Sequence, residues 1–274
     1  VTFSYNITDG SASVAQTATL DLLPVDEPAP SISALGAQFQ VDSYPLTYQT
    51  DPIVTYGVDG GFFVAWQSRG QDGDGWGIYG QAYNASGIKV GGEVQINQVT
   101  AYDQQSPAIT ALSSGGYCVT WANVTSISAR LYDASGQPLT DETALSVQST
   151  IGYSDTRVVA LSSGNLVVSY STTPFSDTNA DVKFLIISSD LQILQGPLQA
   201  NTTTADYQNY ARTFALPNGG FGITWHSQSQ DAPGYDVFFR LFSANGVAVT
   251  GELRANLNVA GDQLHPTVAV GTDG

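Results

Sequence analysis

An internal repeat is the feature that most constrains the fold of this 274-residue chain. Four apolar runs, DGGFFVAW, SGGYCVTW, SGNLVVSY and NGGFGITW, each end in an aromatic residue: Trp66, Trp121, Tyr170 and Trp225. Successive aromatic residues lie 55, 49 and 55 positions apart, and residues 71–94 align with 230–253 without a gap. A repeat of this length is typical of propellers, solenoids and other arrays of stacked units.

Each copy contains the pattern of four short antiparallel strands. A half-alternating run such as PAITALSS is joined by Gly-Gly to YCVTW, and GIYGQAY is joined by Ala-Ser-Gly to a last run such as EVQIN. No segment combines helical periodicity with helix caps. Units of this size must stack to bury both faces, and radial stacking protects their edges. We therefore predict an all-β fold of four-stranded antiparallel repeats of about 55 residues, arranged as β-propeller blades with the aromatic residues packed between them.

The repeat also predicts the domain boundaries. Residues 1–30 read as strand, Asp-Gly turn, strand and the Pro-rich exit PVDEPAP, a pattern that differs from the repeats and indicates a hairpin and linker that precede them. Residues 31–274 form the predicted repeat domain. It comprises the last strand of one blade at 36–50, repeats at about 51–105, 106–154, 155–209 and 210–264, and the start of a fifth at 265–274. The partial copies predict that the chain is a piece of a larger protein, with a blade number that stays open.

Charge and composition limit the partners. With 8 Lys and Arg against 24 Asp and Glu, the net charge of −16 repels nucleic acid and anionic membrane surfaces. No apolar run approaches the roughly 20 residues that span a bilayer, so no direct membrane insertion is expected. The excess of carboxylates serves either solubility or the binding of cations. The single cysteine, Cys118, excludes an internal disulfide and is predicted to be a buried structural thiol.

The aspartates in the central loops of the repeats can be interpreted in two ways. Asp72 and Asp74 flank a glycine in GQDGDGWG, and the fourth copy has Asp231 and Asp236 in its loop. Hard carboxylate oxygens suit Ca²⁺, so these residues are candidate calcium ligands, although an EF-hand loop would continue to a Glu where Tyr83 stands. The other reading is that their side chains bond the backbone of their own turns.

Residues 1–30 resemble the end of bacterial cadherin-like modules of the VCBS type, in which F-Y-x-(V/I)-x-D-G precedes V-N-D-x-P. The repeats are similar to the GG-F-V-V-x-W-Q-S units of large RTX-type calcium-dependent proteins. This resemblance implies a cadherin/Ig-like β-sandwich before the repeats and an extracellular, secreted or cell-surface location on a bacterium. It also implies that the linker acids Asp26 and Glu27 ligate Ca²⁺ between modules.

The sequence offers little for catalysis, and we predict that the chain is not an enzyme. His226 and His265 stand where other copies have Gln67 and Ser106, which favours surface or loop roles. A glycosidase needs two inward carboxylates about 5 to 10 Å apart, and a sialidase-like site needs converging arginines. The six arginines fall at assorted repeat positions, and no common nucleophile, zinc or phosphate-loop motif occurs.

These observations predict a non-enzymatic extracellular module of a giant bacterial surface protein, acting in adhesion or ligand binding with calcium-dependent rigidity. Its expected partner is a cell-surface glycan or protein, or neighbouring copies of itself. The loops at 67–77, 171–181 and 226–236 would line one face, with Trp76 and Tyr235 as ligand-binding aromatic surfaces. Two alternatives stay open: a purely structural spacer, lattice or filament element, and a glycan-processing propeller enzyme.

Overall fold

The computed structural model describes residues 2–8, 13–19, 38–147, 151–174, 179–231 and 233–271. The chain divides into two units, Val1–Phe39 and Gln40–Gly274. In the first unit, β1 (Thr2–Thr8) pairs with β2 (Ser13–Thr19) as an antiparallel hairpin. The predicted linker residues Asp26 and Glu27 lie outside the described residues.

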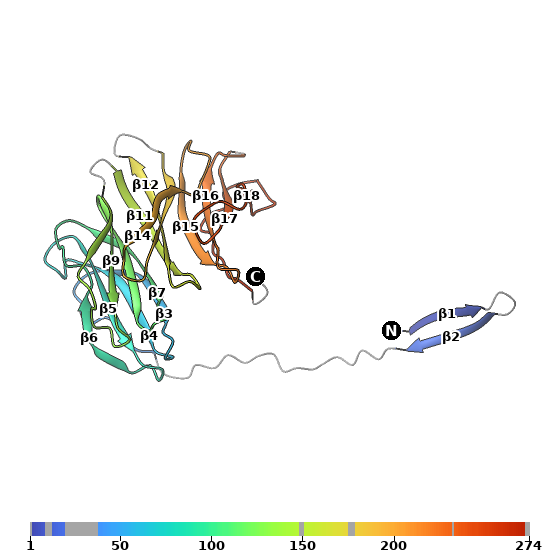
Figure 1. Ribbon diagram of the computed structural model, residues 1–274, viewed down its shortest axis with the longest axis horizontal. Coiled ribbons are helices and arrows are strands. Elements are labelled where there is room, and N and C mark those ends of the chain that lie inside the picture. Colours follow the sequence, from blue (N-terminus) through green and yellow to red (C-terminus); the bar gives the residue numbers. More distant parts are fainter. Residues whose placement is uncertain are drawn as a thin grey trace. The chain divides into compact units, whose positions relative to one another are not determined.

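The described part of the second unit contains four four-stranded antiparallel sheets, each built from consecutive strands (Figure 1). This confirms the predicted all-β fold with one sheet per repeat of about 55 residues, matching propeller blades. Blade 1 consists of β3 (Gln49–Tyr56), β4 (Phe62–Arg69), β5 (Trp76–Tyr83) and β6 (Lys89–Gln95). Blade 2 consists of β7 (Gln104–Ala111), β8 (Tyr117–Asn123), β9 (Ser126–Tyr132) and β10 (Thr143–Val147). Blade 3 consists of β11 (Ile151–Ala160), β12 (Leu166–Pro174), β13 (Asp181–Ile187) and β14 (Ile193–Gln199), and blade 4 of β15 (Gln208–Ala215), β16 (Phe221–Gln228), β17 (Tyr235–Phe242) and β18 (Leu253–Arg254).

The first strand of each blade is its inner strand. β3 contacts β7, β7 contacts β11, and β11 contacts β15, so the four edges line up around a shared axis. The remaining strands of each sheet follow outward in chain order. Among the described residues no helix is long and apolar enough to cross a membrane.

Every inner strand carries a bulge near its beginning. The pairing with the second strand breaks between Thr50 and Ile53 in blade 1, and at the matching place in the other three blades. A bulge bends the strand and re-aims a side chain. One residue in each bulge has the left-handed backbone conformation that non-glycine residues seldom adopt: Asp51 (φ 51°), Ser106 (φ 53°), Asp155 (φ 53°) and Tyr210 (φ 54°). His265 repeats this conformation in the fifth copy (φ 54°).

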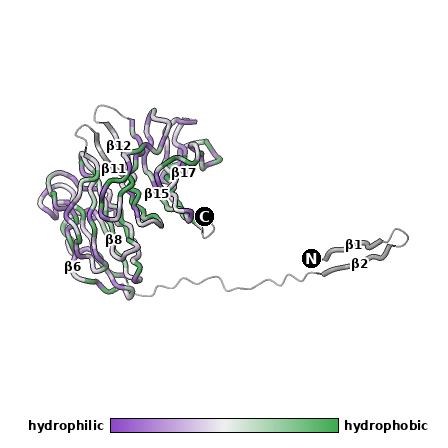
Figure 2. Tube along the Cα trace, viewed as in Figure 1, coloured by the Kyte–Doolittle hydropathy of each residue, from purple (hydrophilic) through white to green (hydrophobic). Residues whose placement is uncertain are grey.

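The hydrophobic core lies between the blades. One cluster joins Phe63 of blade 1 to Trp121 of blade 2, and another joins Phe184 of blade 3 to Trp225 of blade 4. Both tryptophans have no exposed surface, and Tyr170 fills the matching place between blades 2 and 3. Along the chain, hydrophobic residues gather in the strands and hydrophilic residues in several of the loops (Figure 2). The predicted packing between blades is therefore confirmed for Trp121, Tyr170 and Trp225, whereas Trp66 of blade 1 is buried outside these clusters.

Candidate functional site

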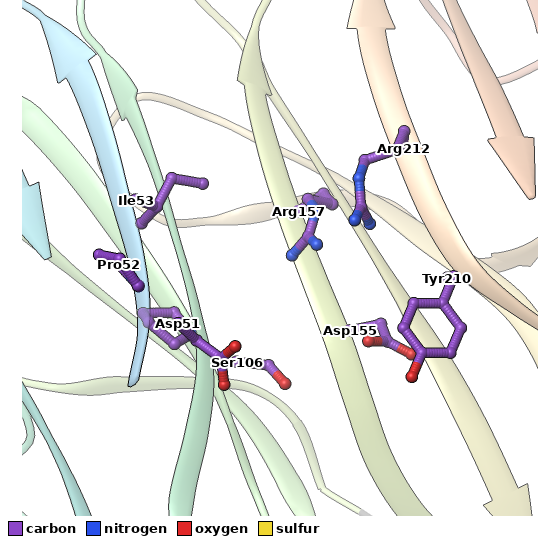
Figure 3. A pocket seen from close by; sticks show the side chains of 9 residues that line it. Asp51, Pro52, Ile53, Ser106, Asp155, Arg157, Tyr210 and Arg212 are labelled. Atoms are coloured by element: carbon purple, nitrogen blue, oxygen red, sulfur yellow. The ribbon is translucent and has the colours of Figure 1, made fainter. Parts of the chain in front are cut away.

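A pocket lies where the four inner strands meet. Its volume is about 370 Å³, within the range of about 300–1,000 Å³ that is common for small-molecule sites. All of its lining residues come from the bulged ends of inner strands (Figure 3): Asp51, Pro52 and Ile53 of β3, Ser106 and Pro107 of β7, Asp155 and Arg157 of β11, and Tyr210 and Arg212 of β15. The repeat therefore directs one position of every blade into a single cavity.

The register of the sheets places this pocket at the end of the blades that carries the loops between the second and third strands. In blade 1, Gln49 near the start of β3 pairs with Ser68 near the end of β4, and Arg69 pairs with Trp76 across the next loop. The bulge and the loop between the second and third strands therefore share one end of the blade. This is the face that the sequence predicted for binding.

Two carboxyl groups, those of Asp51 and Asp155, line the pocket. Burial raises the pKa of Asp155, and the nearby Asp51 charge adds to the rise. The cations of Arg157 and Arg212 and a hydrogen bond from the Tyr210 backbone N–H oppose it. A carboxyl group that retains its proton to higher pH than usual is suited to donate it as a general acid.

Two arginines from neighbouring blades line the same pocket. The described residues contain one ion pair within 4.0 Å, between Arg254 and Asp231 at 3.6 Å, so neither Arg157 nor Arg212 has such a partner there. Burial, reinforced by the Arg212 cation, lowers the pKa of Arg157 to about 10. Burial also lowers the pKa of Arg212. At neutral pH Arg157 is still charged, because its pKa of about 10 lies well above that pH.

The two histidines lie beside the pocket. The ring centroid of Tyr210 lies 4.9 Å from that of His226 and 4.4 Å from that of His265. His265 donates its backbone N–H to Nδ1 of His226 at 3.3 Å. His226 is only 3% exposed, and burial, with the charges of His265 and Arg212, lowers its pKa to about 4. The surface or loop role predicted for His226 is therefore wrong, because its position in β16 faces the packed interior.

The described residues among the candidate calcium ligands all have partners within the protein. Asp72 accepts a hydrogen bond from Asn97 at 3.1 Å, and Asp236 accepts one from Asn256 at 2.6 Å. Asp74 accepts backbone N–H groups of Gly75 and Tyr102, and these bonds lower its pKa. Asp231 pairs with Arg254. No group of three His, Cys, Asp or Glu able to hold a metal occurs in the part of the chain that the structure describes. Calcium binding stays a prediction.

Trp76 and Tyr235 occupy matching places at the start of β5 and β17. Both are partly buried, and their backbone N–H groups donate to Asp103 and Asp262 at 3.0 and 3.1 Å. They belong to blades 1 and 4 and do not line the pocket, although the Tyr235 ring lies 5.0 Å from His226.

Sequence reasoning missed the residues that build the pocket, although the repeat held the signal. Asp51, Ser106, Asp155 and Tyr210 each lie 15 positions before the recurring aromatic residue of their copy. Two positions further on, blades 3 and 4 have Arg157 and Arg212. The view that the arginines fall at assorted repeat positions is therefore wrong for this pair, which converges on one cavity.

Comparison with solved structures shows propellers of carbohydrate-active enzymes. The endo-arabinase of Bacteroides thetaiotaomicron is 13% identical over 81% of this chain and 85% of its own, with a TM-score of 0.50. An α-L-arabinanase of Penicillium chrysogenum, solved with arabinobiose, is 14% identical over 75% of this chain and 66% of its own, with a TM-score of 0.52. A thermostable family-43 glycoside hydrolase is 9% identical over 80% of this chain and 75% of its own, with a TM-score of 0.51. No protein-family model and no curated protein sequence matches.

These matches correct three predictions. The resemblance to cadherin-like and RTX-type surface proteins is not supported, because the solved structures that share this fold include an endo-arabinase, an arabinanase and a family-43 glycoside hydrolase. The same matches also fail to support the predictions of a non-enzymatic adhesion module and of no enzyme, since the fold is one that glycoside hydrolases use. Among the predicted partners, these matches favour a glycan, since both arabinanases are carbohydrate-active propellers.

Proposed function

We propose that this chain is a glycan-processing β-propeller that hydrolyses glycosidic bonds in the pocket at its axis, and that it acts outside the cell. The observation that carries the proposal is the pair of carboxyl groups, Asp51 and Asp155, at the same bulge position of two blades and on one cavity. Structural similarity to arabinanases and a family-43 glycoside hydrolase supports the fold as a scaffold for this chemistry.

Glycoside hydrolysis uses two carboxyl groups with different protonation states. Asp155, whose pKa is raised by burial, is the group suited to protonate the leaving glycosidic oxygen as the bond to the anomeric carbon breaks. Asp51 is the second carboxylate, which takes a proton from the attacking water or itself attacks the anomeric carbon. The inner strands β3 and β11 hold these two side chains on bulges that are fixed by the sheets, so their positions are set before substrate binds.

The test is the release of reducing ends from a panel of plant and algal polysaccharides, arabinan included. We expect Asp155→Asn and Asp51→Asn each to lower the rate by about 10²- to 10⁴-fold, the usual contribution of a positioned acid or base. Asp190→Asn is the matched control, because Asp190 is exposed in the turn between β13 and β14, at the other end of blade 3. Hydrolysis that is unchanged in both pocket variants, or absent from the wild type on every polysaccharide, would contradict the proposal.

A further inference from the structure

We propose that the pocket selects sugars that carry a carboxylate, the uronic acids, and that Arg157 and Arg212 together bind this group. The inference rests on the proposed function for the identity of the ligand as a sugar. Its own basis is the pair of arginines, which the hydrolytic chemistry of Asp51 and Asp155 does not require.

The repeat brings the two guanidinium groups together. Arg157 and Arg212 both lie two positions after the bulge residue, on the inner strands β11 and β15, which contact each other. Figure 3 shows both side chains on the same side of the pocket, across from Asp51 and Ser106. Two cations so placed repel each other, and the Arg212 charge is one of the causes of the lowered pKa of Arg157.

Most of their donor groups have no protein acceptor among the described residues. Arg157 donates through Nη1 to the Thr156 carbonyl at 2.5 Å, and Arg212 donates through Nη1 to the Ala211 carbonyl at 2.9 Å. A guanidinium has five N–H donors, so each retains several for a ligand. Neither has an ion-pair partner within 4.0 Å in the described chain. A partly buried cation without a partner is unfavourable, and an incoming anion would remove that cost.

Another pair of arginines shows what a structural role looks like in this fold. Arg130 donates to the carbonyls of Thr140 and Ile96 at 2.8 and 3.1 Å. Arg240 makes the same two bonds in blade 4, to the carbonyls of Thr250 and Ala200 at 3.1 and 3.0 Å. These guanidinium groups tie their own blade to the end of the blade before it. Arg157 and Arg212 make no such connection and face the cavity instead.

The charges of the pocket favour a monoanion. Two arginines are accompanied by the carboxyl groups of Asp51 and Asp155, which would repel a phosphate with two negative charges. A carboxylate matches the planar fork of a guanidinium and accepts two parallel hydrogen bonds from it. The net charge of −16 does little to exclude an anion from the pocket, because salt at about 0.1 M screens exposed charges that lie more than about 10 Å away.

Equilibrium binding tests the inference without relying on turnover. Calorimetry would compare oligogalacturonate with its methyl ester, which has the same sugar chain without the charge, on the wild type and on Asp155→Asn. We expect the acid to bind at least tenfold more tightly than the ester, since charge-assisted hydrogen bonds from a guanidinium to a carboxylate are much stronger than those to a neutral ester. Glucuronate oligosaccharides and a 6-sulfated galactan are measured alongside, to separate carboxylate from sulfate.

Substitutions test whether Arg157 and Arg212 cause the preference for the acid over its methyl ester. Arg157→Gln and Arg212→Gln should each remove most of the preference, and Arg157→Lys should restore part of it, because lysine keeps the charge but not the fork. Arg130→Gln is the control and should lower the melting temperature while leaving the preference intact. Equal binding of acid and ester, no binding of either uronate, a preference that survives in the double Gln variant, or tighter binding of the sulfated galactan would overturn the inference. Hydrolysis that fails while this preference holds would reject the proposed function alone.

Discussion

At the scale of single residues, the repeat position of His226 shows two different side chains in the same structural role. His226 in blade 4 and Gln67 in blade 1 each accept a backbone hydrogen bond from the bulge of the next copy. Nδ1 of His226 accepts the backbone N–H of His265, the bulge residue that follows blade 4, at 3.3 Å. In blade 1, Oε1 of Gln67 accepts the backbone N–H of Ser106, the bulge residue of blade 2, at 2.9 Å. Each side chain thus holds the strained bulge of the next copy in place. An imidazole does so only while it is neutral, because a protonated Nδ1 cannot accept.

We expect His226→Gln to make stability less dependent on pH. Burial lowers the pKa of His226 from 6.5 to about 4 in the folded protein, so the unfolded chain binds more protons between these values. The contribution of the neutral imidazole is complete above pH 6.5 and is lost as the pH falls toward 4. Between pH 7 and 5, the melting temperature of the wild type should fall by a few degrees more than that of the variant, since 1 kcal/mol is worth about 2–4 °C in a domain of this size. Parallel curves for the two proteins would show that His226 does not titrate on unfolding.

Single residues also show where sequence reasoning reached its limit. The recurring aromatic residues were predictable, because the same residue type ends the same apolar run in every copy. The bulge position has Asp51, Ser106, Asp155, Tyr210 and His265, and no side-chain chemistry is common to all five. They share a backbone φ near +53°, which comes from the pairing of strands and is not a property of the residue types. The pocket therefore became visible only once the fold was known.

At the scale of the blade, a recurring asparagine forms hydrogen bonds both to the third strand of its own blade and to the first strand of the next copy. In blade 3, Oδ1 of Asn201 accepts the Val182 N–H at 2.9 Å, and its Nδ2 donates to Asp181 at 2.7 Å and to Gln208 at 3.4 Å. Asn97 and Asn256 make the same set of bonds in blades 1 and 4. The aspartate of each set is one of the loop acids, which gives those acids a structural role.

Blade 1 builds the same network from a different aspartate. Gly77 stands where blades 3 and 4 have Asp181 and Asp236, and a Cβ at Gly77 would lie 2.5 Å from Oδ2 of Asp72. The carboxylate of Asp72 therefore occupies the space of the missing side chain, from five positions earlier in the loop. Local turn chemistry was predictable, as at Asn84, whose Oδ1 accepts the N–H groups of Ser86 and Ile88. The contact of Asp72 with Asn97 was not, because the partner is 25 residues away.

Removing Asn201 from the network of blade 3 should destabilise the propeller strongly. Asn201 is 2% exposed, and Asn201→Ala leaves the Val182 N–H buried without its acceptor. We expect a loss of about 2–4 kcal/mol, because an unsatisfied buried group costs about 1–3 kcal/mol beyond the lost bonds. Asn218→Ala is the matched control, since Asn218 is exposed in a turn and accepts only the Gly220 N–H. Denaturant unfolding of the two variants measures the difference, and equal midpoints would reject the role of the network.

At the scale of the whole molecule, neighbouring blades are joined by apolar clusters and by one recurrent acid. Glu142 of blade 2 accepts the N–H groups of Gln98 and Val99 at 2.8 and 3.1 Å, from the segment that follows blade 1. Glu252 of blade 4 accepts the N–H groups of Thr202 and Thr203 in the same way. These carboxylates bond to backbone groups and do not neutralise cations. Most of the 24 acids are uncompensated, because the chain has only 8 Lys and Arg.

This charge imbalance predicts how the molecule responds to ions. Raising NaCl from about 10 mM to about 150 mM should raise the melting temperature, because the screening length falls from about 30 Å to about 8 Å and repulsion among the acids weakens. Calcium, as a ligand of the folded state, should add a further rise at constant ionic strength, which EGTA reverses. Asp26→Asn tests the linker site and Asp74→Asn the loop site, and neither substitution alters a residue of the pocket. If Ca²⁺ and Mg²⁺ at equal ionic strength give the same melting temperature in all three proteins, the acids act through screening alone and the predicted calcium sites are rejected.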